Sequence, residues 1–297
     1  MIINNERKNN NKEVNMHGTD LLPYEIYRTI IPRLFVSFPM HWHEEIEIVY
    51  VVSGRAKYMV DFTEYIIEKG DTLIIPPSSL HSFEQFEDED FDAATIIFAQ
   101  NMVSNNLIDI CAIKYIMPIF NNEIYLPIHI KSEDLSGKEV KKYIWKAINE
   151  HLNKEPAYEI RIRISFLNII QYFYKENLIS KGKNSVSSVR TISQIKAITN
   201  YIEEHFAEKI SLDNLAEFAN ISLYHLSHIF KKCTGQSPNE YINFYRLTMA
   251  ANRLLAEDTQ ILNIAIDCGY NNISYFNRAF KKRYGLTPKE YRNKHRN

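Results

Sequence analysis

The spacing of apolar residues changes along this chain, and each spacing predicts a different kind of element. From Tyr24 to about Ile130, short β-branched and aromatic runs such as EIEIVYVV, KYMVD, DTLII and AATIIFA alternate with turn residues. Such runs predict the strands of a small barrel or sandwich. Residues 139–152 and 156–178 instead repeat their apolar positions every three or four residues, which predicts amphipathic helices.

These patterns divide the chain into five segments. Residues 1–15 are rich in Asn and Lys without apolar periodicity, which predicts a disordered tail. A barrel at 16–132 precedes the amphipathic helices at 133–180, and the polar stretch KGKNSVSSVR at 181–190 is typical of a linker. Residues 191–297 have a helical pattern throughout. The predicted fold class is α+β and multidomain: an all-β N-terminal barrel with added helices, then an all-α C-terminal domain.

Composition restricts the class of protein. A chain of 297 residues with 45% apolar and 24% charged residues is globular and long enough for two domains. Cys111, Cys233 and Cys268 lack the close spacing of metal or redox motifs. We find no leader pattern and no apolar run near the ~18 residues that a membrane span needs, so we expect a cytoplasmic protein without a membrane partner.

The net charge of −1 conceals a difference between the two halves. Residues 191–297 contain 14 Lys and Arg against 10 Asp and Glu, so this part is +4 and the remainder is −5. The cations are concentrated towards the C-terminus. An ordinary helix face exposed to solvent can also carry such a run of charges. The charge is therefore compatible with nucleic-acid binding but does not establish it.

A duplication carries most of the functional information. FKKCTGQSPNEY, starting at Phe230, aligns with FKKRYGLTPKEY, starting at Phe280, and upstream LAEF at Leu215 aligns with IAID at Ile264. Two copies are too few for a solenoid, which needs at least three units. A duplicated helical module is the better interpretation.

Each copy predicts a helix, a turn and a second helix. The first copy has helices at 212–218 and 223–233, with Ser222 as the N-cap of the second. In the second copy a helix at 263–268 is followed by one that Asn272 or Ser274 caps and that runs to about Tyr284. Gly235 and Gly285 follow the second helices, where a left-handed residue is favoured. Residues 239–257 form a connecting helix about 28 Å long at 1.5 Å per residue.

The outer faces of the second helices carry groups suited to a DNA groove. Side chains near the start of such a helix can reach base edges, whereas later lysines pass the phosphates. The candidate DNA-binding residues are Tyr224, Ser227, His228, Lys231, Lys232, Ser274, Tyr275, Asn277, Arg278, Lys281 and Lys282. The alternative interpretation is a helical domain that binds protein.

Residues 191–297 resemble the AraC/XylS family of transcriptional regulators. YHLSHIFKKCTGQSPNEYINFYRLTMAANRLL is similar to the first unit of that family with its connecting helix, and IAIDCGYNNISYFNRAFKKRYGLTPKEYR to the signature second unit. The resemblance implies two helix-turn-helix units that bind double-stranded DNA. It implies base contacts from Tyr224, Ser227, His228, Ser274, Asn277 and Arg278. His228 stands where the family often has Arg, which leaves the base preference of the first unit open. The resemblance favours activation of transcription over repression, with RNA polymerase as a partner.

The N-terminal half contains a second group of chemically active residues. In HWHEEIEIVYVV, the side chains of His41, His43, Glu45 and Glu47 would all lie on one face if the run is a strand. The spacing HxH-x3-E-x6-G and the later G-x5-P-x4-H, which ends at His81, resemble the two motifs of cupins. Phe35, Ser78 and Gln85 depart from those motifs.

The cupin resemblance leaves two functions open for the barrel. In cupin enzymes the residues matching His41, His43, Glu47 and His81 hold a divalent metal, and this set would suit Zn, Mn, Fe or Ni. The chain could then be a metal-dependent cupin enzyme fused to a DNA-binding domain. Alternatively, these four residues and Glu45 bind a small-molecule effector inside the barrel, and no metal or other cofactor is needed. We favour the sensor, because the sequence adds no further acid–base or nucleophile arrangement, so no catalytic residue is assigned.

The helices between the two domains also have two interpretations. Ile160, Ile164, Leu167 and Phe173 form an apolar stripe that resembles the segment through which the family forms homodimers. The stripe could equally cover the barrel. In either case we expect the bound effector to change how the barrel packs against these helices and so to reorient the DNA-binding units.

Overall fold

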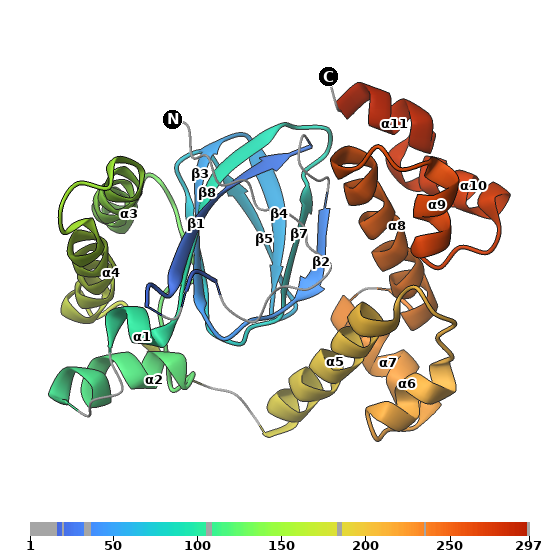
Figure 1. The fold of residues 1–297 in the computed structure, drawn as a ribbon. Coiled ribbons are helices and arrows are strands. Elements are labelled where there is room, and N and C mark those ends of the chain that lie inside the picture. Colours follow the sequence, from blue (N-terminus) through green and yellow to red (C-terminus); the bar gives the residue numbers. More distant parts are fainter. Residues whose placement is uncertain are drawn as a thin grey trace.

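The computed structural model describes residues 17–19, 21–32, 37–104, 109–182, 186–234 and 236–295. The predicted tail at 1–15, residues 183–185 of the predicted linker, Gly235 and the side chain of Lys232 lie outside these residues. A β domain occupies the centre of the molecule (Figure 1), with helices α3 (Leu135–Asn153) and α4 (Tyr158–Lys175) on one side. The C-terminal helices lie on its other side (Figure 1).

Two antiparallel sheets form the β domain, as the strand pattern predicted. The first sheet has the order β1 (Tyr24–Ile31), β8 (Phe91–Phe98), β3 (Ile46–Ser53), β6 (Thr72–Ile75) and β10 (His129–Ile130). The second sheet has the order β2 (Ser37–His41), β7 (His81–Gln85), β4 (Arg55–Val60) and β5 (Thr63–Glu68). A short pair of β9 (Ile124–Tyr125) and β11 (Ser180–Lys181) lies outside them.

The first sheet is buried on both faces. Along β3, Val49 and Val51 belong to the apolar core between the sheets, whereas Ile48 and Tyr50 belong to a second core. This second core also contains the buried residues of α3 and α4, so these helices cover the outer face of the sheet. Between the sheet and α3 the chain forms α1 (Gln100–Val103), a π-helical turn at Ala112–Ile116 and α2 (Met117–Phe120).

The predicted apolar stripe on α4 divides between two environments. Phe173 is fully buried against the sheet and Leu167 is partly buried, which agrees with the covering role. Ile160 and Ile164 are 61% and 43% exposed, and so lie outside that core.

The C-terminal domain is helical and contains both predicted modules. Its elements are α5 (Val186–His205), α6 (Leu212–Phe218), α7 (Leu223–Thr234), α8 (Pro238–Ala256), α9 (Ile261–Asp267), α10 (Ile273–Tyr284) and α11 (Pro288–His295). Helix α5 begins at Val186, which lies inside the segment predicted as a linker. Of the two caps considered for α10, the structure uses Asn272, whose side chain accepts a hydrogen bond from the Tyr275 amide.

We predict that Phe166→Ala weakens the β domain strongly. The Phe166 ring is fully buried and stacks on Phe98 at a centroid distance of 4.4 Å, so its removal leaves a cavity between α4 and the sheet. The expected loss is about 3–5 kcal/mol in the free energy of unfolding, measured by urea denaturation. Ile66→Ala, at an exposed apolar position on β5, is the control and should change this free energy by about 0.5 kcal/mol or less. Equal effects of the two substitutions would contradict the packing described.

Candidate functional site

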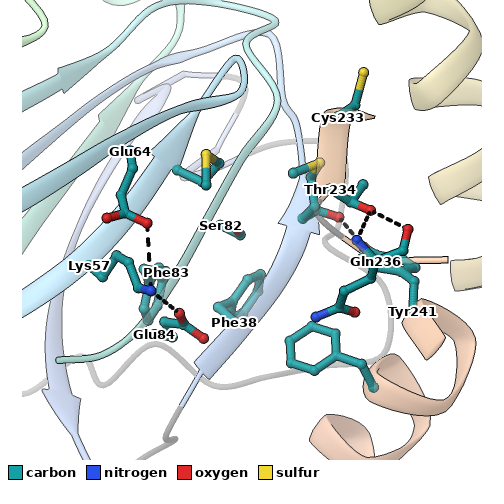
Figure 2. A pocket seen from close by; sticks show the side chains of 13 residues that line it. Phe38, Lys57, Glu64, Ser82, Phe83, Glu84, Cys233, Thr234, Gln236 and Tyr241 are labelled. Atoms are coloured by element: carbon teal, nitrogen blue, oxygen red, sulfur yellow. Dashed lines mark hydrogen bonds and ion pairs between the residues drawn. The ribbon is translucent and has the colours of Figure 1, made fainter. Parts of the chain in front are cut away.

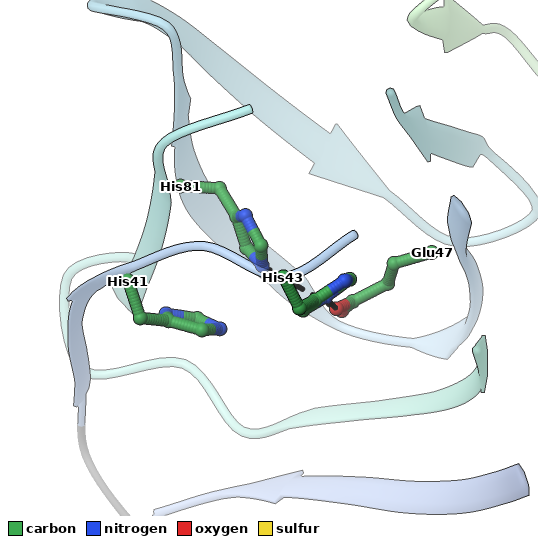
Figure 3. A group of neighbouring side chains, drawn as sticks. All are labelled: His41, His43, Glu47 and His81. Carbon is green, nitrogen blue, oxygen red and sulfur yellow. Dashed lines mark hydrogen bonds and ion pairs between the residues drawn. The ribbon is translucent and has the colours of Figure 1, made fainter. Parts of the chain in front are cut away.

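Four polar side chains meet at one end of the β domain (Figure 3). His41 is the last residue of β2, His43 lies in the connection to β3, Glu47 is in β3, and His81 begins β7. One nitrogen or oxygen atom from each lies within 4.8 Å of those of the others. The sequence prediction therefore selected residues that are close together in space.

The reason for this proximity differs from the one predicted. HWHEEIEIVYVV is not a single strand, because β2 ends at His41 and β3 begins at Ile46. The two strands belong to different sheets, so the side chains converge across the interior rather than along one strand face. Glu45 lies in the same connection, with its Oε2 3.4 Å from Nδ1 of His43.

Glu47 lies between two of the histidines. Its Oε2 is 3.1 Å from Nε2 of His43 and 3.4 Å from Nε2 of His81. The carboxylate is fully buried, and His41 and His81 are buried as well. A buried carboxylate is stabilised when a proton, a cationic group or a metal ion balances its charge.

Backbone carbonyls fix the orientation of two of the rings. Nδ1 of His41 lies 2.9 Å from the carbonyl oxygen of Pro39, and Nδ1 of His81 lies 2.9 Å from that of Ser79. Because a carbonyl oxygen only accepts, each Nδ1 is the donor, and in the neutral ring Nε2 carries the lone pair. This arrangement also holds the rings of metal-ligating histidines.

Neighbouring groups extend the cluster. Burial raises the pKa of Glu45, but the hydrogen bond and charge interaction with His43 outweigh burial and leave this pKa below its ordinary value. His17 lies on the other side, with its ring centroid 5.3 Å from that of His43 and its Nδ1 3.1 Å from the Tyr27 hydroxyl. Sequence analysis missed His17, because it precedes the first strand and matches no motif spacing.

The interior beyond the cluster is filled rather than hollow. Val49, Tyr58, Phe83 and Phe91 are buried in one apolar core between the sheets. These side chains therefore form a packed apolar core between the two sheets.

Helices α7 and α10 each separate a buried face from an exposed one. Leu226, Ile229 and Phe230 of α7 are buried, as are Phe276 and Phe280 of α10. The predicted DNA-binding residues whose side chains are described are all exposed: Tyr224, Ser227, His228, Lys231, Ser274, Tyr275, Asn277, Arg278, Lys281 and Lys282. Both helices thus present polar and basic faces to solvent.

Another cation of the basic C-terminal segment has a different environment. The Arg283 guanidinium carbon lies 4.1 Å from the ring centroid of Phe244, and Nη2 donates to the Ser37 hydroxyl at 3.5 Å. Arg283 thus lies beside the β domain. Arg283 is itself exposed, as are the adjacent Lys281 and Lys282.

Two family models match this chain. The model described as an AraC-like ligand binding domain matches residues 36–147, and the one described as a helix-turn-helix domain matches residues 215–294. Together they cover about two thirds of the chain and correspond to the β domain and the paired helices. The chain belongs to the AraC family.

Curated relatives match almost the whole length of this AraC-family protein. The transcriptional regulator YdeC of Bacillus subtilis is 25% identical over 289 residues, which are 95% of this chain and 96% of YdeC. The transcriptional activator RhaS of Escherichia fergusonii is 24% identical over 279 residues, which are 93% of this chain and 96% of RhaS. A structure of ToxT from Vibrio cholerae covers 91% of this chain and 98% of its own, with a TM-score of 0.50 at 13% identity. The likeness to ToxT concerns the fold alone.

These findings confirm the regulator interpretation. The AraC-family protein is a transcriptional regulator that binds DNA through its helix-turn-helix domain and is controlled by an effector through its ligand-binding domain. Its relatives are named as regulators, which favours the sensor over the fused cupin enzyme. Among the described residues, no helix is both long and apolar enough to cross a membrane.

Proposed function

We propose that this regulator contacts DNA with the exposed faces of α7 and α10. The observation that carries the proposal is the amphipathic character of both helices, with apolar residues in the domain core and hydrogen-bonding and cationic groups outside. In this arrangement, base edges are contacted by Tyr224, Ser227, His228, Ser274, Tyr275, Asn277 and Arg278. Phosphates are contacted by Lys231, Lys281 and Lys282. Helix α8 joins the two units and, at 19 residues, spans about 28 Å, close to the ~34 Å of one duplex turn.

The cluster at His41, His43, Glu47 and His81, with Glu45 beside it, is the proposed effector site. These groups can hydrogen-bond a polar small molecule, and they also fit a divalent metal. The fit rests on the two carbonyl-bound imidazoles, of which His81 directs Nε2 to Glu47, and on the buried carboxylate, whose charge a cation can balance. A metal ion there would balance this charge and offer a coordination position to an effector.

We also propose the direction of control, the partners and the location of this regulator. RhaS is named as an activator, so we propose activation, with RNA polymerase as a partner and the cytoplasm as the location. We further propose a homodimer through α4, where the exposed Ile160 and Ile164 lie one turn apart on one face. Pairing of two copies would remove this apolar strip from water.

For the DNA contact, we predict that Lys281→Glu and Lys282→Glu combined with Arg278→Ala weaken binding at least about 100-fold. The substitutions remove one base contact and reverse two phosphate contacts. The measurement is a titration of a duplex that the wild-type protein selects from random-sequence DNA. Wild-type affinity should also fall steeply between about 50 and 200 mM salt. Lys138→Glu with Lys146→Glu, both exposed on α3, is the control, which reverses two lysine charges outside the helix-turn-helix domain. Unchanged binding by the triple variant would exclude this surface.

For the metal, we predict close to one divalent ion per chain in protein purified without chelators. Glu47→Gln or His81→Asn should lower the affinity for the ion by about 10–100-fold, because each removes a ligand or the group that orients one. The measurement is elemental analysis followed by calorimetric titration. His205→Gln, at a partly exposed histidine outside the cluster, is the control. A content below ~0.1 ion per chain would remove the metal and leave the organic effector.

For the dimer, we predict that Ile160→Glu with Ile164→Glu gives a monomer at ~100 μM, whereas the wild-type chain sediments as a dimer. The contact would then hold two carboxylates from each protomer, and burying them would be too costly. Ile66→Glu, at an exposed position on β5, should leave the dimer intact. A wild-type chain that is monomeric at this concentration would refute the proposal.

A further inference from the structure

The polypeptide that carries the cluster also makes the contact between the two domains. His41 and His43 contribute their rings to the cluster, while the alternate residues Met40 and Trp42 pack with residues of the C-terminal domain. Met40 is buried in the same apolar core as residues of α5 and α8, and Trp42 is partly buried against it. Successive side chains therefore face the cluster and the DNA-binding domain in turn.

Hydrogen bonds fix this segment to two helices. Nε1 of Trp42 donates to Oδ1 of Asn200 in α5 at 3.0 Å. The buried Tyr241 of α8 donates its hydroxyl hydrogen to the carbonyl oxygen of Met40 at 3.2 Å. The Lys196 ammonium lies 4.2 Å from the centroid of the Trp42 ring. Each bond joins the DNA-binding domain to a residue adjacent to a histidine of the cluster.

A second segment repeats this arrangement beside His81. Its neighbour Leu80 is fully buried in the C-terminal core. The Leu80 amide donates to Asp61 at 2.9 Å, and the Ser79 hydroxyl donates to the same carboxylate at 2.8 Å. Because the Ser79 carbonyl also holds Nδ1 of His81, a movement of this ring is carried to the residue next to Leu80.

The interface leaves room for such movement. A cavity of about 120 Å³ lies between the second sheet and helices α7 and α8 (Figure 2), and Phe38, Met40, Tyr241 and Phe244 are among its lining residues. On its β side, Lys57 is held between Glu64 and Glu84 (Figure 2). Met40 therefore borders empty space on the side where it meets α8, so the contact can repack without first expelling a side chain.

We propose that residues 40–42 transmit the state of the cluster to α5 and α8, with Trp42 and Tyr241 as positioning residues. The inference rests on the proposed role of the cluster as the effector site. A ligand that draws His41 and His43 together shifts the backbone of this segment. The shift moves the Met40 carbonyl that accepts from Tyr241 and the Trp42 indole that donates to Asn200. The ligand then controls DNA binding only through its different affinity for the two arrangements.

The test is a double-mutant cycle on DNA affinity in the full-length chain. Glu47→Gln perturbs the cluster, and Tyr241→Phe with Asn200→Ala removes the two hydrogen bonds that join residues 40–42 to α5 and α8 while keeping the Tyr241 ring. We expect Glu47→Gln to change the Kd for the selected duplex by at least about 5-fold in the wild-type background and by less than about 2-fold in the linked variant. Tyr270→Phe removes a hydroxyl bonded to Asn243 within the C-terminal domain, and is the matched control that should preserve the 5-fold change.

The outcomes separate this inference from the proposed function. Equal effects of Glu47→Gln in both backgrounds would overturn the transmission and leave the effector site standing. If Glu47→Gln leaves the Kd for the duplex unchanged in the wild-type background, this result would overturn the transmission and count against the cluster as a control site. His43→Gln repeats the cycle if Glu47→Gln unfolds the protein.

A failure to bind any duplex would defeat the proposed function, and the transmission is then decided by fluorescence. The chain has two tryptophans, so Trp145→Phe leaves Trp42 as the sole reporter at the interface. Glu47→Gln should shift its emission, and the shift should disappear when Asn200→Ala and Tyr241→Phe are added. An emission that does not respond to Glu47→Gln overturns the transmission.

Discussion

Residues 46–51 of β3 are buried on both faces of the strand, so every side chain there must fit one of two apolar layers or the cluster beside the layer between the sheets. A slip by one residue would exchange the faces, placing Glu47 against α3 and α4 and apolar side chains beside the histidines. The cost of burying a carboxylate without a partner makes that register unfavourable. The same burial that attaches the helices to the sheet therefore also places Glu47 at the end of the interior, between His43 and His81.

Much of this arrangement was predictable because its signals are local. The duplicated segment placed the first helix of the first unit at 212–218, and α6 has these bounds, while α7 ends one residue beyond its prediction. The cupin-like spacing selected His41, His43, Glu47 and His81 because turns and strand lengths between them are short. The helical period at 156–178 likewise identified α4, although periodicity alone could not say which apolar residues meet the sheet.

Other features depend on contacts that a single sequence does not encode locally. The break between β2 and β3 falls within an alternating run whose pattern fits one strand as well as two. His17 joins the cluster only through packing of the N-terminal segment beside Tyr27. Helix α5 begins within a polar stretch that lacks an apolar stripe, and Trp42 and Asn200 are 158 positions apart. Alternation likewise shows which side chains point inward but not how closely they pack.

The placement of Met40 and Leu80 within the core of the helical domain has a practical consequence for dissecting the protein. A cut at the end of the β domain follows a boundary in the chain but divides a continuous body of apolar contacts. The excised helical fragment would have an exposed apolar surface around Tyr241, and the excised β fragment would have a matching apolar surface around Met40. Poor solubility of either fragment would then result from the truncation and would not reflect the solubility of the intact regulator.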